Sequence, residues 1–434
     1  MSDKLPVPLR AYRLLSAASR PLAPLLLARR LQRGKEIQSR LGERRGEAAF
    51  ERPDGPLVWI HGASVGELIC VLPLIGRIVA RNIRLLVTSG TVTSSVMAEQ
   101  RLPPGVIHQF VPLDVPRYMR RFLEHWQPDL ALFVESDLWP NMLIETARRN
   151  VPMIMVNGRL SEHSFERWRY LPRSIGNLLN RFDLCLARTP ADALRIDDLG
   201  APRIVTTGNL KFDVPAPPAD TASLNALRDA IGDRPVLAAT STHPGEEELM
   251  IAAHARLRAN FPGLLTLIAP RHAERGPDVM DIAASAGLSA TLRSAGNLPK
   301  RSTDVYVADT MGELGLIYRL APVVFVGGSL VRHGGQNPIE PAKLGAAILH
   351  GPHVGNFAEI YKALDEAHGA ETVLDADRLT AALAAMLGQP AARERMTQAA
   401  RHTVDTLGGA LERTLQAIEP YLMQIALRQR VGHA

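Results

Sequence analysis

The 434-residue sequence predicts an α/β protein with two doubly wound parallel sheets, and three features support this fold class. Short apolar runs of β type alternate with helix-length stretches from Leu57 onward, a pattern typical of parallel sheets covered by helices on both faces. A proline-rich segment, residues 213–220, interrupts the alternation, which then restarts. Glycine-rich turns follow several apolar runs, as they do where a strand leads into a helix.

The first 48 residues precede this pattern, and we interpret them as a basic amphipathic segment associated with a membrane. The net charge of the chain is +6, and residues 1–52 hold 12 Lys/Arg and 5 Asp/Glu, which leaves about −1 for the rest. The longest apolar run of the segment, residues 21–28, is far shorter than the roughly 20 residues of a membrane-spanning helix. We therefore expect peripheral or monotopic binding to an anionic membrane surface.

A second interpretation of this segment remains open, namely a helical pair packed on the core of the protein itself. We expect the folded domains to survive deletion of residues 1–33, because the first predicted core strand begins only at Leu57. Basic residues gathered in one terminal segment also argue against a nucleic-acid partner, whose binding surface would be basic on the folded domain.

Cysteine and histidine usage argues against disulfides and against a metal site. The only two cysteines, Cys70 and Cys185, lie in apolar stretches, which favours a reducing compartment. No Cys/His cluster has the spacing of zinc ligands, so we predict no metal.

The first domain is predicted over residues 49–212. Its helices are expected to include residues 66–81 and 139–150. Its candidate strands are residues 57–61, 83–88, 106–111, 130–135, 153–157 and 184–187.

The second domain is predicted over residues 221–390, after a stiff linker at residues 213–220. Two domains joined in this way should face each other across a cleft, with ligands at the carboxyl ends of the strands. The last stretch, residues 391–434, is predicted to be helical, and a return across the domain junction is one arrangement open to it. The candidate strands are residues 236–240, 264–269, 305–308, 323–326 and 347–350.

The most informative motif of the first domain spans residues 59–67, where a buried strand breaks at Gly62 and a helix begins near Gly66. Such a turn exposes backbone N–H groups at a helix N-terminus. Glu67 lies in the first helical turn, where the helix dipole favours a carboxylate that can accept a proton. The alternative is that Glu67 only complements the dipole.

Two further charged residues in this domain are candidates for the site. Glu135 follows a predicted strand at its carboxyl end, where an unpaired carboxylate is costly unless it is used; its alternative is a structural helix cap from Ser136 or Asp137. Lys211 lies just before the linker, where a cation can reach a phosphate shared between the domains. Its alternative is an ordinary surface lysine.

The dinucleotide and P-loop classes of enzyme fit the sequence poorly. Residues 62–66 do not read GxGxxG, no acidic residue follows the second strand, and no Walker-type Gly-Lys-Ser/Thr occurs. Two Rossmann-like domains without these fingerprints leave two-domain nucleotide-sugar glycosyltransferases as the leading class, by analogy of fold.

The second domain carries its candidate ligand residues directly after predicted strands. Pro270 and Arg271 follow one strand, and residues 309–313 follow another. Residues 326–340 read as a strand, a glycine-rich loop and a helix with Asn337 at the N-cap and Pro338 at the first position, which suits a phosphate. Glu340 in the first turn is a candidate partner for a ribose.

Arginines interleaved with aromatic residues form a last candidate surface in the first domain. They could meet the phosphates and acyl chains of a lipid, although a solvated basic helix face explains the same pattern. The arginines are Arg159, Arg167, Arg169 and Arg173, beside Phe165, Trp168 and Tyr170.

Seven motifs in order resemble the 3-deoxy-D-manno-octulosonate (Kdo) transferases of lipid A biosynthesis, over about residues 42–356. The resemblance implies a glycosyltransferase B fold and transfer of Kdo from CMP-Kdo to the glucosamine disaccharide of a lipid A precursor (lipid IVA). It further implies inversion at the anomeric centre, no metal or cofactor, and the cytoplasmic face of a bacterial inner membrane. The motifs are HGASVGE, VESDLWPN, VNGRLSEHS, GNLKFD, APRH, DTMGEL and GGSLVRHGGQNPIEPAKLG.

The resemblance also assigns roles to individual residues. Glu67 would be the general base, while Glu135 and Lys211 would assist the transition state. Many relatives have Glu-Thr-Glu where this chain has Glu135-Ser136-Asp137, and some have a more continuous apolar N-terminal anchor. CMP would be held by Pro270, Arg271, Met311, Gly312, Glu313, Asn337, Pro338, Ile339 and Glu340.

Two other functions remain open from the sequence. One is a different nucleotide-sugar transferase or epimerase on the same fold, which a panel of donors would separate. The other is a non-catalytic membrane scaffold, which would have no reason to keep Glu67, Glu135 and Lys211 together.

Overall fold

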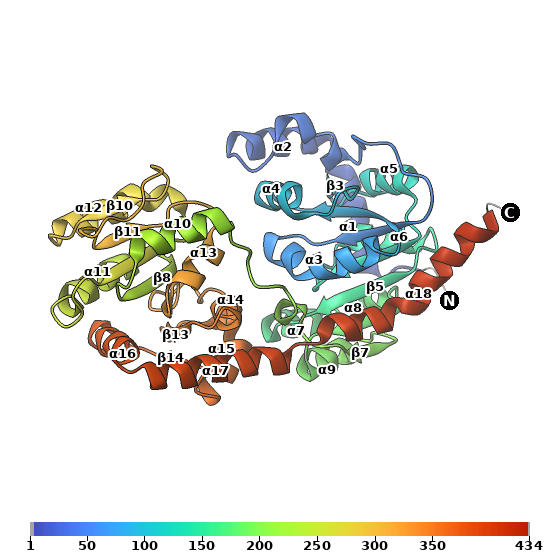
Figure 1. Cartoon of the computed structure of the whole chain (residues 1–434). Coiled ribbons are helices and arrows are strands. Elements are labelled where there is room, and N and C mark those ends of the chain that lie inside the picture. The colour runs from blue at the N-terminus through green and yellow to red at the C-terminus, as the bar shows by residue number, and fades with distance from the viewer. Residues whose placement is uncertain (1–3, 433–434) are drawn as a thin grey trace. The chain divides into compact units, whose positions relative to one another are not determined.

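A computed structural model describes residues 4–432 of the chain, with side chains as far as Leu427. The chain divides into two compact units, labelled in Figure 1. Unit 1 comprises the chain up to Val214 and again from Gly408, and unit 2 comprises Pro215–Leu407. Residues 1–48, interpreted above as a separate segment, thus belong to unit 1 by their contacts.

Unit 1 is built on a seven-stranded sheet in which every neighbouring pair is parallel. The spatial order is β3-β2-β1-β4-β5-β6-β7, so the chain starts in the middle and winds outward twice. The six predicted strands are confirmed, and β7 is an additional edge strand. The strands are β1 (Leu57–His61), β2 (Arg84–Ser89), β3 (Ile107–Phe110), β4 (Leu130–Val134), β5 (Met153–Gly158), β6 (Leu184–Ala187) and β7 (Ile204–Thr206).

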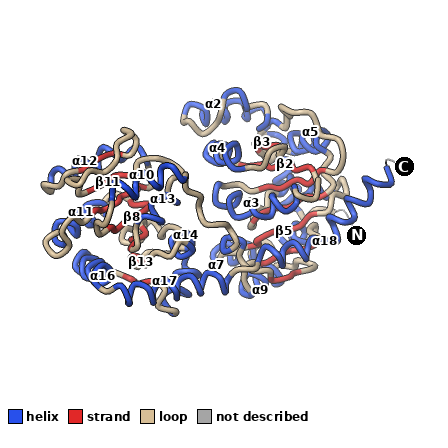
Figure 2. The backbone as a smooth tube through the Cα atoms, viewed as in Figure 1, coloured by secondary structure: helices blue, strands red, loops and turns tan. Residues whose placement is uncertain are grey.

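Helices cover both faces of this sheet, as Figure 2 shows. One face, with Trp59 and Phe133, packs against α1, α5, α6, α8 and α9, and the other, with Val58 and Ile60, packs against α3 and α18. The helices are α1 (Val7–Ala18), α2 (Ala23–Gln32), α3 (Val65–Val79), α4 (Val92–Arg101), α5 (Pro116–Trp126), α6 (Pro140–Ala147), α7 (Glu162–Arg169), α8 (Pro172–Leu179), α9 (Pro190–Asp198) and α18 (Ala410–Gly432).

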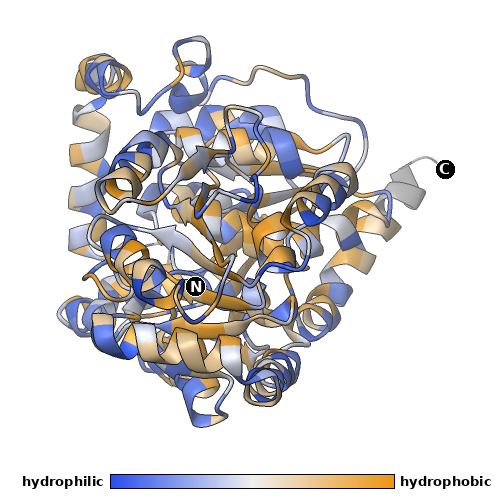
Figure 3. Ribbon diagram, turned by 60° about the vertical axis from the view of Figure 1, so that its left-hand side comes forward, coloured by the Kyte–Doolittle hydropathy of each residue, from blue (hydrophilic) through white to orange (hydrophobic). Residues whose placement is uncertain are grey.

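Unit 2 repeats the design with a second seven-stranded parallel sheet, in the order β10-β11-β9-β8-β12-β13-β14. Its central strands are mainly apolar and buried. Figure 3 colours the ribbon by hydropathy, with apolar stretches in orange. The predicted strands are confirmed, and β10 and β14 are additional edge strands. The strands are β8 (Val236–Thr242), β9 (Leu265–Pro270), β10 (Ala290–Leu292), β11 (Val305–Val307), β12 (Val323–Val326), β13 (Ala347–His350) and β14 (Ala370–Thr372).

Most helices of unit 2 alternate with its strands. The last of them, α17, is followed by α18 of unit 1, so the chain returns to unit 1 at its C-terminal end. The helices are α10 (Thr221–Ile231), α11 (Glu246–Leu257), α12 (Gly276–Ser285), α13 (Leu314–Leu320), α14 (Ile339–Lys343), α15 (Ala358–Glu366), α16 (Ala376–Gly388) and α17 (Pro390–Leu407).

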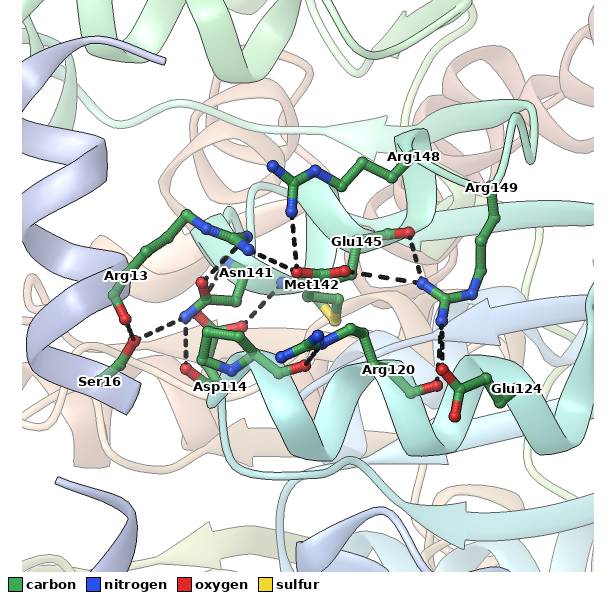
Figure 4. A network of polar contacts seen from close by, with 11 residues as sticks. Arg13, Ser16, Asp114, Arg120, Glu124, Asn141, Met142, Glu145, Arg148 and Arg149 are labelled. Carbon is green, nitrogen blue, oxygen red and sulfur yellow. Dashed lines mark hydrogen bonds and ion pairs between the residues drawn. The ribbon is translucent and has the colours of Figure 1, made fainter. Parts of the chain in front are cut away.

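Helix α1 is fixed to unit 1 by an apolar and a polar set of contacts. Leu5 and Leu9 are buried in the same core as Trp59. The guanidinium of Arg13 donates to the buried carboxylate of Glu145 at 2.6 Å, and the Tyr12 hydroxyl donates to Asp114 at 2.9 Å. Figure 4 shows Arg13 of α1 directed at Asn141 and Glu145 of α6. The side of α1 that faces the sheet is therefore packed on the core of the protein, as the second interpretation of this segment proposed.

The outer side of the same helices is apolar and exposed. Leu14, Leu15 and Leu25 are 71%, 70% and 72% exposed. Exposed arginines accompany them, for example Arg10 and Arg29. Among the residues that the structure describes, no helix is both long and apolar enough to cross a membrane.

Candidate functional site

The site in unit 1 lies at the carboxyl ends of β1 and β4, where the sequence predicted it. Glu67 occupies the first turn of α3, and both of its carboxylate oxygens accept hydrogen bonds from the preceding loop. The backbone N–H of Ala63 donates at 2.7 Å and the hydroxyl of Ser64 at 2.8 Å. Ser64 is the N-cap residue of α3 and accepts from the backbone N–H of Glu67. The carboxylate is thus held in one orientation by a local cap.

The electrostatic surroundings of Glu67 raise the pKa of its carboxyl above the ordinary value, chiefly because burial disfavours the charged form. The two hydrogen bonds oppose this shift, and the negative charge of Glu135 adds to it. A carboxylate with a raised pKa is a stronger base than an exposed one, which suits proton abstraction near neutral pH.

Glu135 and Lys211 are brought together by the fold. Glu135 follows β4 directly, and its carboxylate oxygen lies 3.5 Å from the ammonium nitrogen of Lys211. Glu135 has a backbone φ of 59°, a conformation that is rare for side chains other than Gly, Asn or Asp and that accumulates at functional sites. Strand ends and sequence-distant loops therefore assemble the Glu67, Glu135 and Lys211 charges on one side of the sheet.

Two positioning residues in unit 1 escaped the sequence analysis. Asn157, buried in β5 with a φ of 56°, accepts a hydrogen bond from the backbone N–H of Leu210 at 3.0 Å and so fixes the turn that carries Lys211. His61, buried at the end of β1, places its Nε2 3.1 Å from Asp137 and its Nδ1 2.9 Å from the Thr88 hydroxyl. The signal was available, since both residues are polar within otherwise apolar strands.

The glycine-rich loop of unit 2, residues 327–335, is organised by Glu246, which the sequence analysis also missed. This carboxylate is fully buried at the start of α11. It accepts from the backbone N–H groups of Gly328 at 2.7 Å, and of Ser329 and Leu330 at 3.0 Å each. Gly327 has no room for a side chain, because a Cβ there would lie 2.6 Å from a backbone oxygen.

The helix start predicted at Asn337 is corrected by the structure. Pro338 is the N-cap and α14 begins at Ile339, so the helix is only five residues long. The Asn337 side chain nonetheless accepts from the backbone N–H of Ile339 at 3.0 Å, and its amide donates to Glu340 at 3.2 Å.

The reason for this shift lies in the backbone of Pro338, whose φ of −85° and ψ of −8° depart from the regular α-helical values. The first regular turn therefore starts one residue later than predicted. The N–H of Ile339 is already bonded to Asn337, so a ligand at this loop would meet other backbone groups and side chains.

The second predicted nucleotide segment, Met311 to Glu313, lies between β11 and α13. Met311 is exposed, and Gly312 has a φ of 83°, which favours glycine. The carboxylate of Glu313 is paired with Arg293 through two hydrogen bonds of 3.0 and 2.8 Å. These bonds hold the pKa of Glu313 below its ordinary value, so it is ionised and oriented by Arg293.

Basic groups gather near Pro270 and Arg271 at the end of β9. Three imidazoles lie there: His243 stacks on His333 with ring centroids 4.0 Å apart, and His272 lies 6.1 Å from His243. Burial, followed by the neighbouring imidazoles and Arg271, lowers the pKa of His243 to about 4. The neighbouring guanidinium groups of Arg271 and Arg275 give this region a positive charge that suits an anionic ligand such as a phosphate.

The predicted acceptor arginines are exposed or half-buried in unit 1. Arg167 and Arg169 lie in α7, Arg173 lies in α8, and Arg159 follows β5. The Arg169 guanidinium lies 3.3 Å from Glu166 and 5.7 Å from the centre of the Phe165 ring. Within the described part of the chain, no group of three or more His, Cys, Asp or Glu residues has a geometry that could hold a metal ion.

Comparison with known proteins identifies close relatives. Residues 36–214 match the family described as 3-Deoxy-D-manno-octulosonic-acid transferase (kdotransferase). The 3-deoxy-D-manno-octulosonic acid transferase of Haemophilus influenzae is 35% identical over 394 residues, which cover 89% of this chain and 92% of that protein. The enzyme of the same name from Bordetella pertussis is 35% identical over 420 residues, covering 93% and 98%.

Solved structures share the two-unit architecture at much lower identity. A UDP-N-acetylglucosamine 2-epimerase from Listeria monocytogenes matches with a TM-score of 0.55 and 15% identity, covering 86% of this chain and 98% of that one. A glycotransferase of kitacinnamycin matches with a TM-score of 0.50 and 17% identity, covering 85% and 100%. These likenesses confirm the predicted fold, two Rossmann-like domains of the glycosyltransferase B type.

Proposed function

The chain belongs to the 3-deoxy-D-manno-octulosonic acid (Kdo) transferase family, and on that premise we propose that it transfers Kdo from CMP-Kdo to a lipid A precursor. The acceptor is the glucosamine disaccharide of that lipid, and the reaction inverts the anomeric configuration. The observation that carries the proposal is the grouping of Glu67, Glu135 and Lys211 at one sheet edge of unit 1.

The reaction requires one bond to form as another breaks. An acceptor hydroxyl oxygen attacks the anomeric carbon of Kdo, and Glu67 takes the hydroxyl proton. The bond from the anomeric carbon to the CMP phosphate oxygen breaks, and CMP leaves with the electron pair. Lys211, held beside Glu135, is suited to stabilise the charge that develops in this transition state.

The donor nucleotide is assigned to unit 2. Its phosphate is expected near Arg271 and the histidine cluster, and its nucleoside is expected along the glycine-rich loop from Gly327 to Gly335 and the 311–313 turn. Positive side chains supply the charge stabilisation in this scheme, so the proposal includes no metal and no cofactor besides the donor.

The location proposed for the enzyme is the cytoplasmic face of the bacterial inner membrane. The exposed leucines of α1 and α2, such as Leu14 and Leu25, together with the neighbouring arginines, support this proposal. Apolar side chains among basic ones are typical of a surface that lies on anionic lipid.

One assay tests the proposed reaction. The full-length protein is incubated with CMP-Kdo and a lipid A precursor, with EDTA in a parallel sample, and products are counted by mass spectrometry. We expect a Kdo-bearing lipid in both samples and none with UDP or GDP sugars as donors. Interconversion of a UDP sugar without transfer to lipid would instead support the alternative function, a sugar epimerase.

A further inference from the structure

An apolar groove of about 400 Å³ lies on unit 1, beside the proposed catalytic residues. One wall comes from α1, through Pro8, Leu9 and Tyr12; the opposite wall comes from α7 and α8. The floor is the loop that joins β4 to α6, residues 136–140. Its volume falls in the range of roughly 300–1,000 Å³ that is typical of small-molecule sites.

The side chains that line this groove are mainly hydrocarbon and aromatic, and they include Leu138, Trp139, Trp168 and Leu171. Two of the polar side chains among them are already engaged. The Tyr12 hydroxyl donates to Asp114 at 2.9 Å, and the Asp137 carboxylate lies 3.1 Å from the His61 imidazole. An occupant that brings its own polar groups would find few partners, whereas a hydrocarbon chain needs none.

The position of the groove links it to the reaction. Its floor begins at Ser136, the residue that follows Glu135 in sequence, so a molecule in the groove is held next to the site. Exposed arginines of α7 and α8, including Arg167 and Arg173, stand on the same helices as one wall. A ligand with an apolar chain and an anionic head group fits this arrangement, because the chain can contact the apolar groove and the head group the nearby arginines.

We propose that this groove binds one acyl chain of the glycolipid acceptor, an inference that rests on the proposed function and deepens it. The N-terminal helix α1 is then part of the acceptor site, and acylation of the acceptor contributes to its recognition. Each methylene that the groove takes out of water strengthens binding by a factor of about four, so a chain of several methylenes gives strong discrimination against a deacylated acceptor.

A charge placed on the groove wall tests this inference. Leu171 lines the groove and is 44% exposed, so Leu171→Glu should fold and should repel hydrocarbon. Leu194, which is 67% exposed in α9 and does not line the groove, provides the matched control Leu194→Glu. Circular dichroism confirms that both variants are folded.

Kinetics with two acceptors give the first readout. For an acylated lipid A precursor, Leu171→Glu should raise KM by about tenfold or more, because contact with at least two methylenes is lost. For the deacylated disaccharide its KM should match that of the unmodified protein, which should itself be higher than for the acylated acceptor. Equal KM values of the unmodified protein for both acceptors would overturn the inference.

Tryptophan fluorescence gives a readout that does not depend on activity. Of the four tryptophans, Trp139 and Trp168 line the groove, whereas Trp59 and Trp126 are fully buried in the core. A fatty acid brominated along its chain should quench the fluorescence saturably in the unmodified protein and in Leu194→Glu. In Leu171→Glu the quenching should need about tenfold more probe.

The two readouts separate the inference from the proposed function. Saturable quenching that Leu171→Glu weakens, without Kdo transfer to either acceptor, would support the groove and reject the reaction. Kdo transfer with quenching that is absent, or that Leu171→Glu leaves unchanged, would keep the reaction and overturn the groove.

Discussion

The Glu67 side chain is held by hydrogen bonds from the loop before α3, so it can act both as a helix cap and as a general base. Its two carboxylate oxygens accept from Ala63 and Ser64, so the side chain acts as a local cap whatever its chemistry. A cap contributes to stability, and a base contributes to turnover. The two roles can therefore be separated by measuring both quantities on two variants.

Glu67→Gln keeps the size of the side chain and removes its basicity. General-base catalysis contributes typically about 10²–10⁴-fold, so turnover should fall by that factor, while calorimetry should show unchanged binding of CMP to unit 2. The control is Ser64→Ala, which removes the N-cap of α3. It should lower the free energy of unfolding by about 0.5–2 kcal/mol and leave most of the turnover. A fully active Glu67→Gln would rule out the general-base role.

His108 in β3 is a half-buried imidazole whose surroundings keep it neutral. Its Nδ1 lies 3.2 Å from the guanidinium of Arg40, which can only donate, and its Nε2 lies 2.9 Å from the Ser89 hydroxyl. Burial, followed by the charges of Arg40 and Arg44, lowers the pKa of His108 to about 3. In the unfolded chain the pKa returns to about 6.5.

This pKa difference makes stability depend on pH. Between about pH 6.5 and pH 3 the unfolded chain binds a proton at His108 that the folded chain does not, so stability falls as the pH is lowered through this window. The contribution of one such group is a slope of at most about 1.4 kcal/mol per pH unit. His108→Gln should have a shallower slope in denaturant titrations between pH 6.5 and pH 4. Equal slopes would contradict the assignment.

At the scale of single residues, sequence reasoning located groups by their place at strand ends. Glu67, Glu135 and Arg271 were found in this way because parallel strands present their carboxyl ends at one edge. Asn157 and Glu246 were missed, since their partners are backbone N–H groups of loops far away in the sequence. No spacing rule reveals a contact of that kind.

At the scale of elements, the glycine-rich loop of unit 2 depends on one carboxylate. Glu246 accepts from four backbone N–H groups, three in the loop and one at His243. Glu246→Ala would leave all four without this acceptor, at a cost of about 1–3 kcal/mol for each group that finds no other partner. The loop should reorganise, and calorimetry should show CMP affinity reduced by about tenfold or more.

The matched control for this loop is Glu248→Ala in the same helical turn. Glu248 is exposed and accepts only from the N–H of Gly245, at 2.8 Å, among the interactions described. It should lose a few tenths to 1 kcal/mol of stability and keep its CMP affinity. Equal CMP affinities of the two variants would show that the loop does not hold the nucleotide.

Strands in the middle of each sheet were predictable, and so was the edge strand β3, whereas the edge strands β7, β10 and β14 were not. β1, β6, β12 and β13 occupy the predicted residues, because a strand buried on both faces is a continuous apolar run. The additional strands β7, β10 and β14 are three residues long, and none is fully buried. They carry no apolar run, so their pairing with a neighbouring strand is set by the sheet.

Helices α1 and α2 also correct an expectation about truncation. Leu5, Leu9, Ala23 and Leu27 are buried, so deletion of residues 1–33 would expose core surface that the sequence assigned to a dispensable segment. Leu9→Ala should lower the free energy of unfolding of unit 1 by about 2–5 kcal/mol in denaturant titrations. Leu14→Ala, on the exposed side, should change it by less than about 0.5 kcal/mol. Equal effects would mean that α1 does not pack as described.

At the scale of the whole molecule, the uneven distribution of charge predicts how the protein meets a membrane. Residues 1–52 carry a net charge of +7 and the rest of the chain about −1, which gives the total of +6. Each basic residue near an anionic surface contributes on the order of 1 kcal/mol, and salt screens that attraction. Binding to anionic liposomes should therefore weaken with salt. Serine replacements of Leu14, Leu15 and Leu25 should weaken it further without loss of stability, whereas unchanged binding would place the contact elsewhere.

Helix α18 has a consequence for how the protein is made. Leu415, Ile418 and Leu422 of this helix complete a core with α3 and β1, although they follow the whole of unit 2 in the sequence. Unit 2 is in effect an insertion within unit 1. At about 5–20 residues per second, the ribosome needs on the order of ten seconds or more to pass from Val214 to Gly408. During that interval unit 2 can close on itself, while unit 1 waits with one face of its sheet incompletely covered.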